Sequence, residues 1–457
     1  MDNIRILEFQ EFGTTNVHSL TIALMVCPTV LVLASRRSAA IFAVLAVCVF
    51  MPAQQRYVIG GLDFSMLRLI MVVAWLRVLV RGEYRGLGFG KLDRVVVLWA
   101  LSASIFYVLR IGPSGIVYRL GVSFDVLTAY FLIRALVRTR GEVFVLWRHL
   151  AWIVLALSPF LLYELYAQHN VFGIFNYTGW EIVEVRNGRT RCQGPFAHPI
   201  LAGTFAAAVM PVFIGMLLGK RQRLLFASAC VAAIAIVIAA GSSGPVIACV
   251  VGAFGWGIWL LRKHTRAMIW ATVGLAVVIH FVREQPVWQL IGRLSSLTGG
   301  SGYHRSALID AFIRRFGEWA LMGTDNTAHW GWGLQDTTSQ YVGEGIGGGL
   351  VTFVLFIVML RVGFVQLRLA RETFERLEGP KSPWALLAWG SSVSLAVHCV
   401  SFISVAYFDQ TFQFLLFFFA TVPAFARFRR PKRVKSHAAP RAASAPRPIP
   451  AERFRSS

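Results

Sequence analysis

The sequence predicts an all-α polytopic membrane protein, a bundle of about 12–13 transmembrane helices. Of its 457 residues, 56% are hydrophobic and only 15% are charged, whereas about 25% of the residues in a soluble domain are charged. The apolar runs are long enough to span a hydrocarbon core of about 30 Å, which takes roughly 20 helical residues. They are also too continuous for barrel strands, so helices are the elements that satisfy the backbone in lipid.

The candidate spans are about thirteen apolar runs, which define a transmembrane domain of residues 19–428 after an amino-terminal segment, 1–18. In chain order they are 19–35, 39–53, 66–81, 94–109, 117–136, 146–167, 199–218, 224–240, 244–261, 266–282, 347–367, 384–406 and 411–426. The first run has an alternative interpretation as an interfacial or re-entrant segment, because the topology derived next places the amino terminus outside.

Positive charge orients the chain. A formal net charge of +23 would suggest nucleic acid binding in a soluble protein, but here the basic residues cluster between alternate spans. The clusters are Arg36 and Arg37; Arg81, Arg85 and Lys91; Arg138 and Arg140; Lys220, Arg221 and Arg223; Arg262, Lys263 and Arg266; and Arg368, Arg371 and Arg376. The positive-inside rule makes their side cytoplasmic. Two long polar loops, 168–199 and 283–349, then face outward together.

The carboxy-terminal tail, residues 429–457, is rich in Arg, Lys, Pro, Ala and Ser. With so little apolar surface to bury, it is expected to be a disordered cytoplasmic segment. Its charge is typical of a topogenic segment lying against anionic lipid, and a nucleic-acid or protein partner is the alternative. Five of the six cysteines lie within predicted spans and Cys192 alone lies in an outer loop, so no intramolecular disulfide framework is expected.

The first polar loop concentrates arginine. Arg186, Arg189 and Arg191 precede His198, which stands where the next span begins. The planar guanidinium fork suits phosphate oxygens, so the cluster is a candidate clamp for a diphosphate head group. The alternative is that these arginines extend to the membrane surface and pair with acidic residues of the same loop.

The second polar loop carries periodic apolar positions from Ala307 to Leu321, which predict an amphipathic helix lying on the membrane. A loop of this length is improbable unless it is functional. Its tryptophans, Trp319, Trp330 and Trp332, are candidates for an interfacial belt or for faces on which sugars stack.

Four short motifs, taken together, resemble a known family. They are Arg191-x-x-Gly194-Pro195-Phe196-x-His198-Pro199, Arg293 with Arg305, Asp336-x-x-Ser339-Gln340-Tyr341 with Glu344 and a glycine run, and Tyr407-Phe408-Asp409-Gln410. The chain is similar to the superfamily of O-antigen ligases and O-antigen or exopolysaccharide polymerases in the order of these motifs and in their shared position on the predicted outer side. The similarity extends from about the third span to the thirteenth.

That resemblance implies a multi-pass glycosyltransferase of the bacterial inner membrane with its active loops in the periplasm. Such enzymes take a glycan from undecaprenyl diphosphate and join it to a sugar hydroxyl, on lipid A core or on another repeat unit, without a nucleotide sugar, cofactor or metal. The outer loops agree, since they contain neither an Asp-x-Asp pair nor a His/Cys cluster with ligand spacing.

The resemblance also implies roles for individual residues. Arg191 and Arg305, then Arg293 and Arg189, would bind the diphosphate and stabilise the charge that grows on the leaving group. A general base would take the acceptor proton. Many ligases carry a histidine where this chain reads Asp336-Thr337-Thr338-Ser339.

Because that histidine is absent, Asp336, His304 and His198 are the catalytic candidates, with His329 a further substitute. Family members also often show Ser-Arg where this chain has Ser242-Ser243-Gly244, so one diphosphate arginine is expected to be missing. Both departures favour a polymerase-like or divergent member over a ligase proper.

Two other functions stay open. A transporter or flippase for lipid-linked sugars would place charged residues along a central cavity and show two related halves. A non-catalytic scaffold of a polysaccharide assembly complex would account for the missing histidine and arginine. Three ionisable residues within predicted spans are candidates for a polar path, Asp125, His280 and His398.

Overall fold

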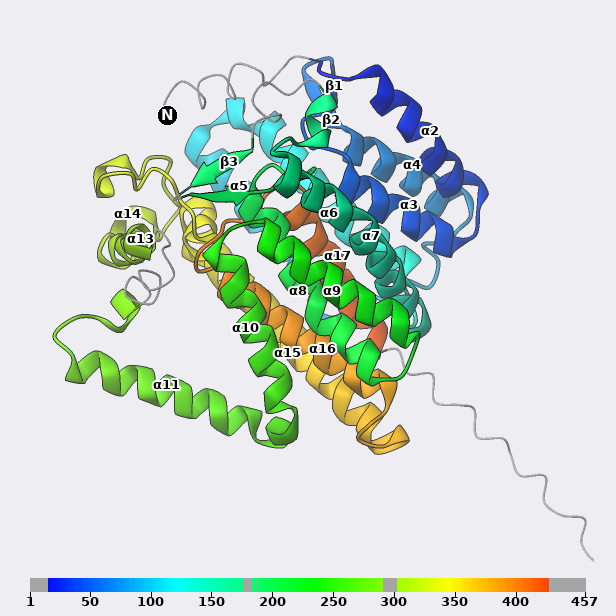
Figure 1. Ribbon diagram of the computed structural model, residues 1–457. Helices are drawn as coiled ribbons and strands as arrows, with labels where there is room; N and C mark the ends of the chain where they lie inside the picture. The colour runs from blue at the N-terminus through cyan, green and yellow to red at the C-terminus, as the bar shows by residue number, and fades with distance from the viewer. Residues whose placement is uncertain (1–14, 176–182, 187, 291–301, 427–457) are drawn as a thin grey trace, which may run out of the picture.

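The computed structural model describes residues 15–175, 183–186, 188–290 and 302–426, and most of them are helical (Figure 1). The first helices are α2 (Ser19–Ala34), α3 (Arg37–Phe50), α4 (Met66–Val80), α5 (Lys91–Ile111), α6 (Ile116–Leu136) and α7 (Arg140–Ala167). The later ones are α8 (Pro199–Leu218), α9 (Arg223–Ala239), α10 (Ser243–Gly257), α11 (Thr265–Val282), α13 (Gly302–Arg314), α14 (Phe316–Trp319), α15 (Gln340–Glu378), α16 (Pro383–Ser401) and α17 (Asp409–Ala426).

Each predicted apolar run coincides with a helix. Within the described chain, seven helical stretches are long and apolar enough to cross a membrane. One of them, Ser243–Val282, joins two predicted runs through the 3-10 turn η3 (Ile258–His264). The all-α membrane architecture is confirmed at this level, and the larger number of about 12–13 spans stays a prediction. The predicted tail, 429–457, and most of the segment 1–18 lie outside the described residues.

Two short antiparallel hairpins interrupt the helices and were not expected. Strand β1 (Arg56–Ile59) pairs with β2 (Leu62–Ser65), and β3 (Glu184–Arg186) pairs with β4 (Arg189–Arg191). Strands of three or four residues are too short to give a readable alternation of apolar and polar positions. The second hairpin falls within the first polar loop.

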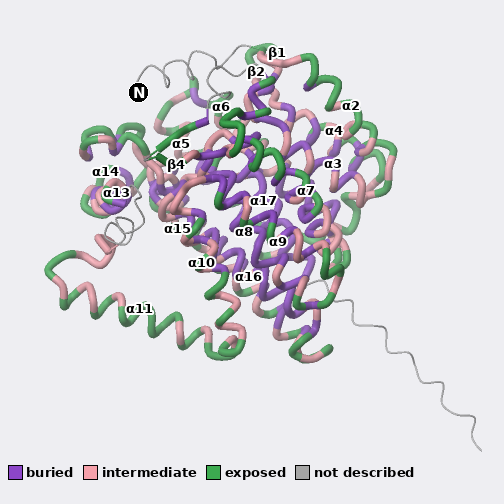
Figure 2. Tube along the Cα trace, in the orientation of Figure 1, coloured by how far each residue is buried: buried purple, intermediate pink, exposed green. Residues whose placement is uncertain are grey.

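Helix α8 lies at the centre of the bundle, with nearly all of its side chains buried between α9, α10 and α16 (Figure 2). Glycine permits this close approach. A Cβ at Gly203 would lie 2.7 Å from the ring of Pro245, and one at Gly215 would lie 2.7 Å from the backbone oxygen of Leu386. Small residues let helix backbones approach in the same way in other membrane proteins.

Ion pairs between helices mark one end of the bundle, which we call the basic end. The pairs are Arg37–Glu142, Arg140–Glu378 and Arg262–Glu375, with N–O distances of 3.0, 2.6 and 2.6 Å. They connect clusters that the charge pattern predicted to share one side. The assignment of that side to the cytoplasm stays a prediction.

The opposite end, which we call the loop end, carries the β3–β4 hairpin and the small helices α13 and α14 (Figure 1). The predicted amphipathic segment is helical, but it breaks at Arg315 between these two helices. Some of its apolar side chains form a small core with those of the following segment: Leu308, Ala311, Phe312, Trp319, Trp330, Leu334 and Val342. Others are exposed, with exposed fractions of 44% for Ile313, 47% for Phe316 and 79% for Leu321. The contact of this segment with a membrane surface therefore stays a prediction.

The three loop tryptophans separate into two kinds. Trp319 stacks on Phe312 with 3.9 Å between ring centroids, and Trp330 is buried beside it. Neither ring is available to a membrane surface or to a sugar. Trp332 is fully exposed. For this tryptophan alone of the three, the interfacial role and the sugar-stacking role both stay predictions.

Helix α11 leaves the bundle after η3, and its main contacts are with η3 and the turn η4 (Val287–Gln289) (Figure 1). None of its residues is buried. A helix that is apolar on every side and has no protein around it is typical of a helix in contact with lipid.

Candidate functional site

The β3–β4 hairpin fixes the orientation of Arg191. On β4 Arg189 is exposed, whereas Arg191, at the end of the strand, lies against the turn at Gly241 and has an exposed fraction of 5%. The next residue donates its backbone N–H to the carbonyl oxygen of Ala239 at 2.9 Å. At Gly241, where φ is +56°, a Cβ would lie 2.4 Å from the oxygen of Thr190. Glycine therefore lets the turn after α9 close against the arginine-bearing strand.

A buried glutamate of α7 secures the segment that follows Arg191. The two carboxylate oxygens of Glu164 accept the backbone N–H groups of Gln193 and Gly194 at 2.9 and 2.8 Å. Asn170 adds a hydrogen bond from its side-chain amide to the oxygen of Gly194 at 3.0 Å. Glu164 was not identified from the sequence, because it contacts a later segment of the chain and no local sequence pattern predicts that contact.

His198 begins α8 and caps it. Its Nδ1 accepts the backbone N–H of Ile200 at 3.1 Å, so the neutral ring carries its proton on Nε2. Burial, followed by the charge of Arg191, lowers the pKa of His198 below its usual value. A neutral imidazole with this tautomer offers an N–H donor to the site and not a basic lone pair.

Arg305, from α13, lies within electrostatic reach of Arg186 and Arg191 although it belongs to a different loop. Burial, followed by the positive charges of Arg186 and Arg191, lowers the pKa of Arg305. Its exposed fraction is 8%, and its guanidinium has no hydrogen-bond or ion-pair partner among the described residues. We call Arg191 and Arg305 the arginine pair.

The arginine pair has little negative charge in contact with it. Arg191 contacts the side chain of Glu184 at 2.5 Å, but that carboxylate is itself 43% exposed. The Nε atoms of both arginines are buried without a partner. Buried charges in proteins are normally paired, so the pair is electrostatically prepared for an anion such as phosphate.

His304 directly precedes Arg305 in α13 and contacts a later part of the same loop. Its Nε2 lies 3.0 Å from the backbone oxygen of Asp336. A carbonyl oxygen only accepts, so Nε2 is the donor and the neutral ring keeps its lone pair on Nδ1. That geometry suits a general base. The exposed carboxylate of Asp336 lies close enough to act electrostatically on His198.

The three catalytic candidates therefore gather around the arginine pair, and other candidates do not. Arg293 lies outside the described residues. Arg189 is exposed on the hairpin. His329 binds Glu318 at 2.7 Å, and that carboxylate also accepts from Trp330 and Arg315.

The three residues considered for a polar path have local partners. Asp125 is bound through both oxygens by Arg68, at 2.7 and 2.6 Å. The Nδ1 of His398 lies 2.9 Å from the hydroxyl of Tyr407, and the ring of His280 lies against that of Trp288. These contacts account for each residue structurally and do not connect the three into a path.

Direct hydrogen bonds connect three of the motifs that carry the family resemblance. Gln340 accepts the backbone N–H of Tyr407 at 2.7 Å, and Gln410 donates to the oxygen of Pro195 at 2.7 Å. Gln340 also donates to Glu344, which accepts from Trp99 of α5 at 2.7 Å. Segments far apart in the sequence therefore form one connected layer at the loop end.

Helix α15 is broken just after this layer. Gly348 and Gly349 have non-helical backbone angles, and a Cβ at Gly349 would lie 2.6 Å from the oxygen of Leu321. Arg110 of α5 binds the freed oxygen of Ile346 at 3.1 Å and the carboxylate of Asp325 at 2.6 Å. Arg110 therefore connects the first part of α15 to α5 and to Asp325, in an earlier part of the second loop.

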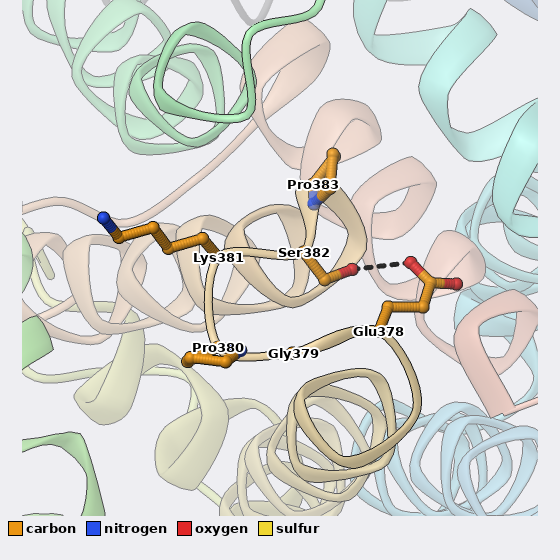
Figure 3. A pocket seen from close by; sticks show the side chains of 6 residues that line it. All are labelled: Glu378, Gly379, Pro380, Lys381, Ser382 and Pro383. Atoms are coloured by element: carbon orange, nitrogen blue, oxygen red, sulfur yellow. Dashed lines mark hydrogen bonds between the residues drawn. The ribbon is translucent and has the colours of Figure 1, made fainter.

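The hollow shown in Figure 3 is remote from these residues. It is lined by the turn from α15 to α16 at the basic end, Glu378 to Pro383, where Ser382 donates to Glu378 at 2.7 Å. Glu378 also pairs with Arg140, so the polar groups there satisfy one another. None of the candidate site residues lines it.

Metal ligation and the comparisons with other proteins add no further assignment. Among the described residues, no group of three or more His, Cys, Asp or Glu side chains is arranged to hold a metal ion. Searches of protein-family models, curated proteins and solved structures found no match for the chain.

Proposed function

We propose that this chain is a membrane glycosyltransferase that moves a glycan from undecaprenyl diphosphate to an acceptor sugar hydroxyl, as an O-antigen or exopolysaccharide polymerase or ligase. The reaction would take place on the periplasmic face of a bacterial inner membrane. The observation that carries the proposal is Arg305, a buried arginine without a carboxylate partner among the described residues, within electrostatic reach of a second buried arginine from another loop.

Each member of the site has a part in the proposed reaction. The acceptor oxygen attacks the anomeric carbon, the bond from that carbon to the diphosphate oxygen breaks, and the diphosphate leaves with the electron pair. Arg191 and Arg305 stabilise the charge that develops on it; one such preorganised donor is worth about 10²–10³ in rate. The Nδ1 of His304 takes the acceptor proton, and the Nε2–H of His198 donates a further hydrogen bond.

The test is complementation of a deletion strain with full-length variants. Arg305→Gln is expected to reduce surface glycan about 100-fold or more and to leave the glycan on the carrier lipid. Arg94→Gln, which changes an exposed arginine of α5 at the basic end, is the matched control and should restore the glycan. Equal restoration by both variants at equal protein abundance would contradict the proposal.

The deletion strain also separates the kinds of activity. Polymer stranded on the carrier indicates a ligase, and single repeat units on the surface indicate a polymerase. Unpolymerised units held on the cytoplasmic leaflet indicate a flippase, and this last result would replace the proposal.

A further inference from the structure

A second arginine at the loop end, Arg119 of α6, also lacks a countercharge in contact. Its guanidinium has no hydrogen-bond or ion-pair partner among the described residues, and its Nε atom is buried without one. The side chain as a whole is half-buried. Its neighbour Arg110 differs, because that residue is neutralised by Asp325 at 2.6 Å.

Two tyrosines surround Arg119. Its guanidinium lies 5.7 Å from the ring centroid of Tyr107, which is within the range of a cation–π contact. Tyr107 lies 5.6 Å from Tyr118, and Tyr118 is 61% exposed. An aromatic face beside an unpaired guanidinium is suited to a sugar that carries a phosphate, since the ring stacks on the sugar and the fork binds the phosphate oxygens.

The position of Arg119 relates it to the proposed reaction. It interacts electrostatically with Glu344, in the short first part of α15 that directly follows Asp336. Arg305 lies beside His304, which binds the backbone of Asp336. The segment from Asp336 to Glu344 therefore has, near each of its ends, an arginine that no carboxylate contacts among the described residues.

The surroundings of Arg119 favour a ligand carried by a lipid. Val117 and Leu120, on either side of it in α6, are 56% and 64% exposed, and Leu109 at the end of α5 is 65% exposed. Such a surface is in contact with lipid in a membrane protein. An anion that reaches Arg119 therefore comes from the bilayer.

We propose that Arg119, Tyr107 and Tyr118 form a second anion site, which binds the phosphate of a lipid-linked acceptor while the arginine pair binds the donor diphosphate. This inference rests on the proposed function and adds a second phosphate site, at the start of α6, to the donor site. Arg119 is a binding residue for the acceptor and takes no part in bond breaking.

The test is lipid binding to the purified full-length protein, measured by native mass spectrometry with undecaprenyl phosphate as the probe. The wild type is expected to bind two lipids per chain. Arg119→Gln and Arg305→Gln should each remove one, with at least a tenfold loss of affinity, because charge-assisted hydrogen bonds are lost. Arg119→Lys should bind with intermediate affinity, and Arg94→Gln should bind both lipids.

The outcomes separate this inference from the proposed function. If only Arg305→Gln loses a lipid, the donor site stands and the second site is wrong; if neither variant changes binding, both are wrong. Phosphatidylglycerol that displaces undecaprenyl phosphate from the Arg119 site at equal concentration would show that Arg119 only extends to the bilayer surface, which overturns the inference. Since Arg119 makes no hydrogen bond or ion pair among the described residues, Arg119→Gln should unfold within a few degrees of the wild-type temperature, and this control is read in the same samples.

Discussion

Two buried arginines, Arg134 at the basic end of the bundle and Arg305 at the loop end, differ in their countercharge. At the basic end Arg134 is buried and pairs with Asp93 at 2.8 Å, and Arg262 pairs with Glu375 while it stacks on Trp259. At the loop end Arg305 is as buried as many core residues but has no carboxylate in contact among the described residues. A paired arginine holds helices together, whereas an unpaired buried arginine lowers stability unless an anion arrives. The number of charged residues in the sequence does not reveal this difference.

The largest expected effect is on stability at the basic end. Asp93→Asn removes the countercharge of Arg134, whose side chain is 2% exposed, so it should lower the free energy of unfolding by about 3–5 kcal/mol. Thermal unfolding of the purified protein measures this. Glu378→Gln, which breaks a pair whose side chains are about one-third exposed, should cost less than about 1 kcal/mol. Equal losses in the two variants would remove the distinction between buried and exposed pairs.

The next effect is on activity at the loop end. His304→Gln keeps a polar side chain but removes the Nδ1 base, so glycan transfer should fall by about 10²–10⁴. Its thermal unfolding should match the wild type, because the half-buried ring makes one hydrogen bond, to the oxygen of Asp336. His329→Gln is the control, since His329 is already bound to Glu318. A comparable loss of transfer in the control would point to general damage to the loop.

Backbone packing beside Arg191 should have a smaller effect. Gly241→Ala places a Cβ 2.4 Å from the oxygen of Thr190 at a φ of +56°, which costs about 1–2 kcal/mol in strain alone and shifts β4. We expect roughly tenfold slower transfer, which corresponds to 1.4 kcal/mol. Gly257→Ala, with no atom within 4 Å of the added Cβ, should leave transfer unchanged. Transfer at the wild-type rate in Gly241→Ala would show that the hairpin position is not critical.

The smallest expected effect is on the pH dependence of stability around Glu318, in the second polar loop. Hydrogen bonds from Trp330, Arg315 and His329 lower the pKa of Glu318 from 4.5 to about 2. Because the folded value is depressed, the stabilisation is present above pH 4.5 and is lost as the pH falls toward 2. Tryptophan fluorescence of the loop should change across that window, and Glu318→Gln should remove the dependence. An unchanged titration in that variant would assign the transition to another group.

The sequence was sufficient for the helices but only in part for the site. Long apolar runs predicted each bundle helix, because burial in lipid dictates both their length and their composition. The expectation that the two polar loops meet rested on charge alternation, and the structure does place Arg305 within electrostatic reach of Arg191. Their roles in binding and catalysis stay predictions.

What the sequence could not predict are contacts that exist only after packing. Glu164 reaches the backbone after Arg191, Arg110 joins α5 to the broken part of α15, and Arg119 is left without a partner. Each depends on which helix ends become neighbours. The tautomers of His198 and His304 likewise follow from hydrogen bonds to backbone groups that only the fold brings near.

The measurement that tests the central claim most directly is the affinity of the purified full-length protein for undecaprenyl diphosphate, compared between the wild type and Arg305→Gln. If the unpaired arginine at the loop end is an anion site, the dissociation constant should rise at least tenfold, while the temperature of unfolding without ligand stays the same or rises. An unchanged dissociation constant in a normally folded Arg305→Gln protein would contradict the claim.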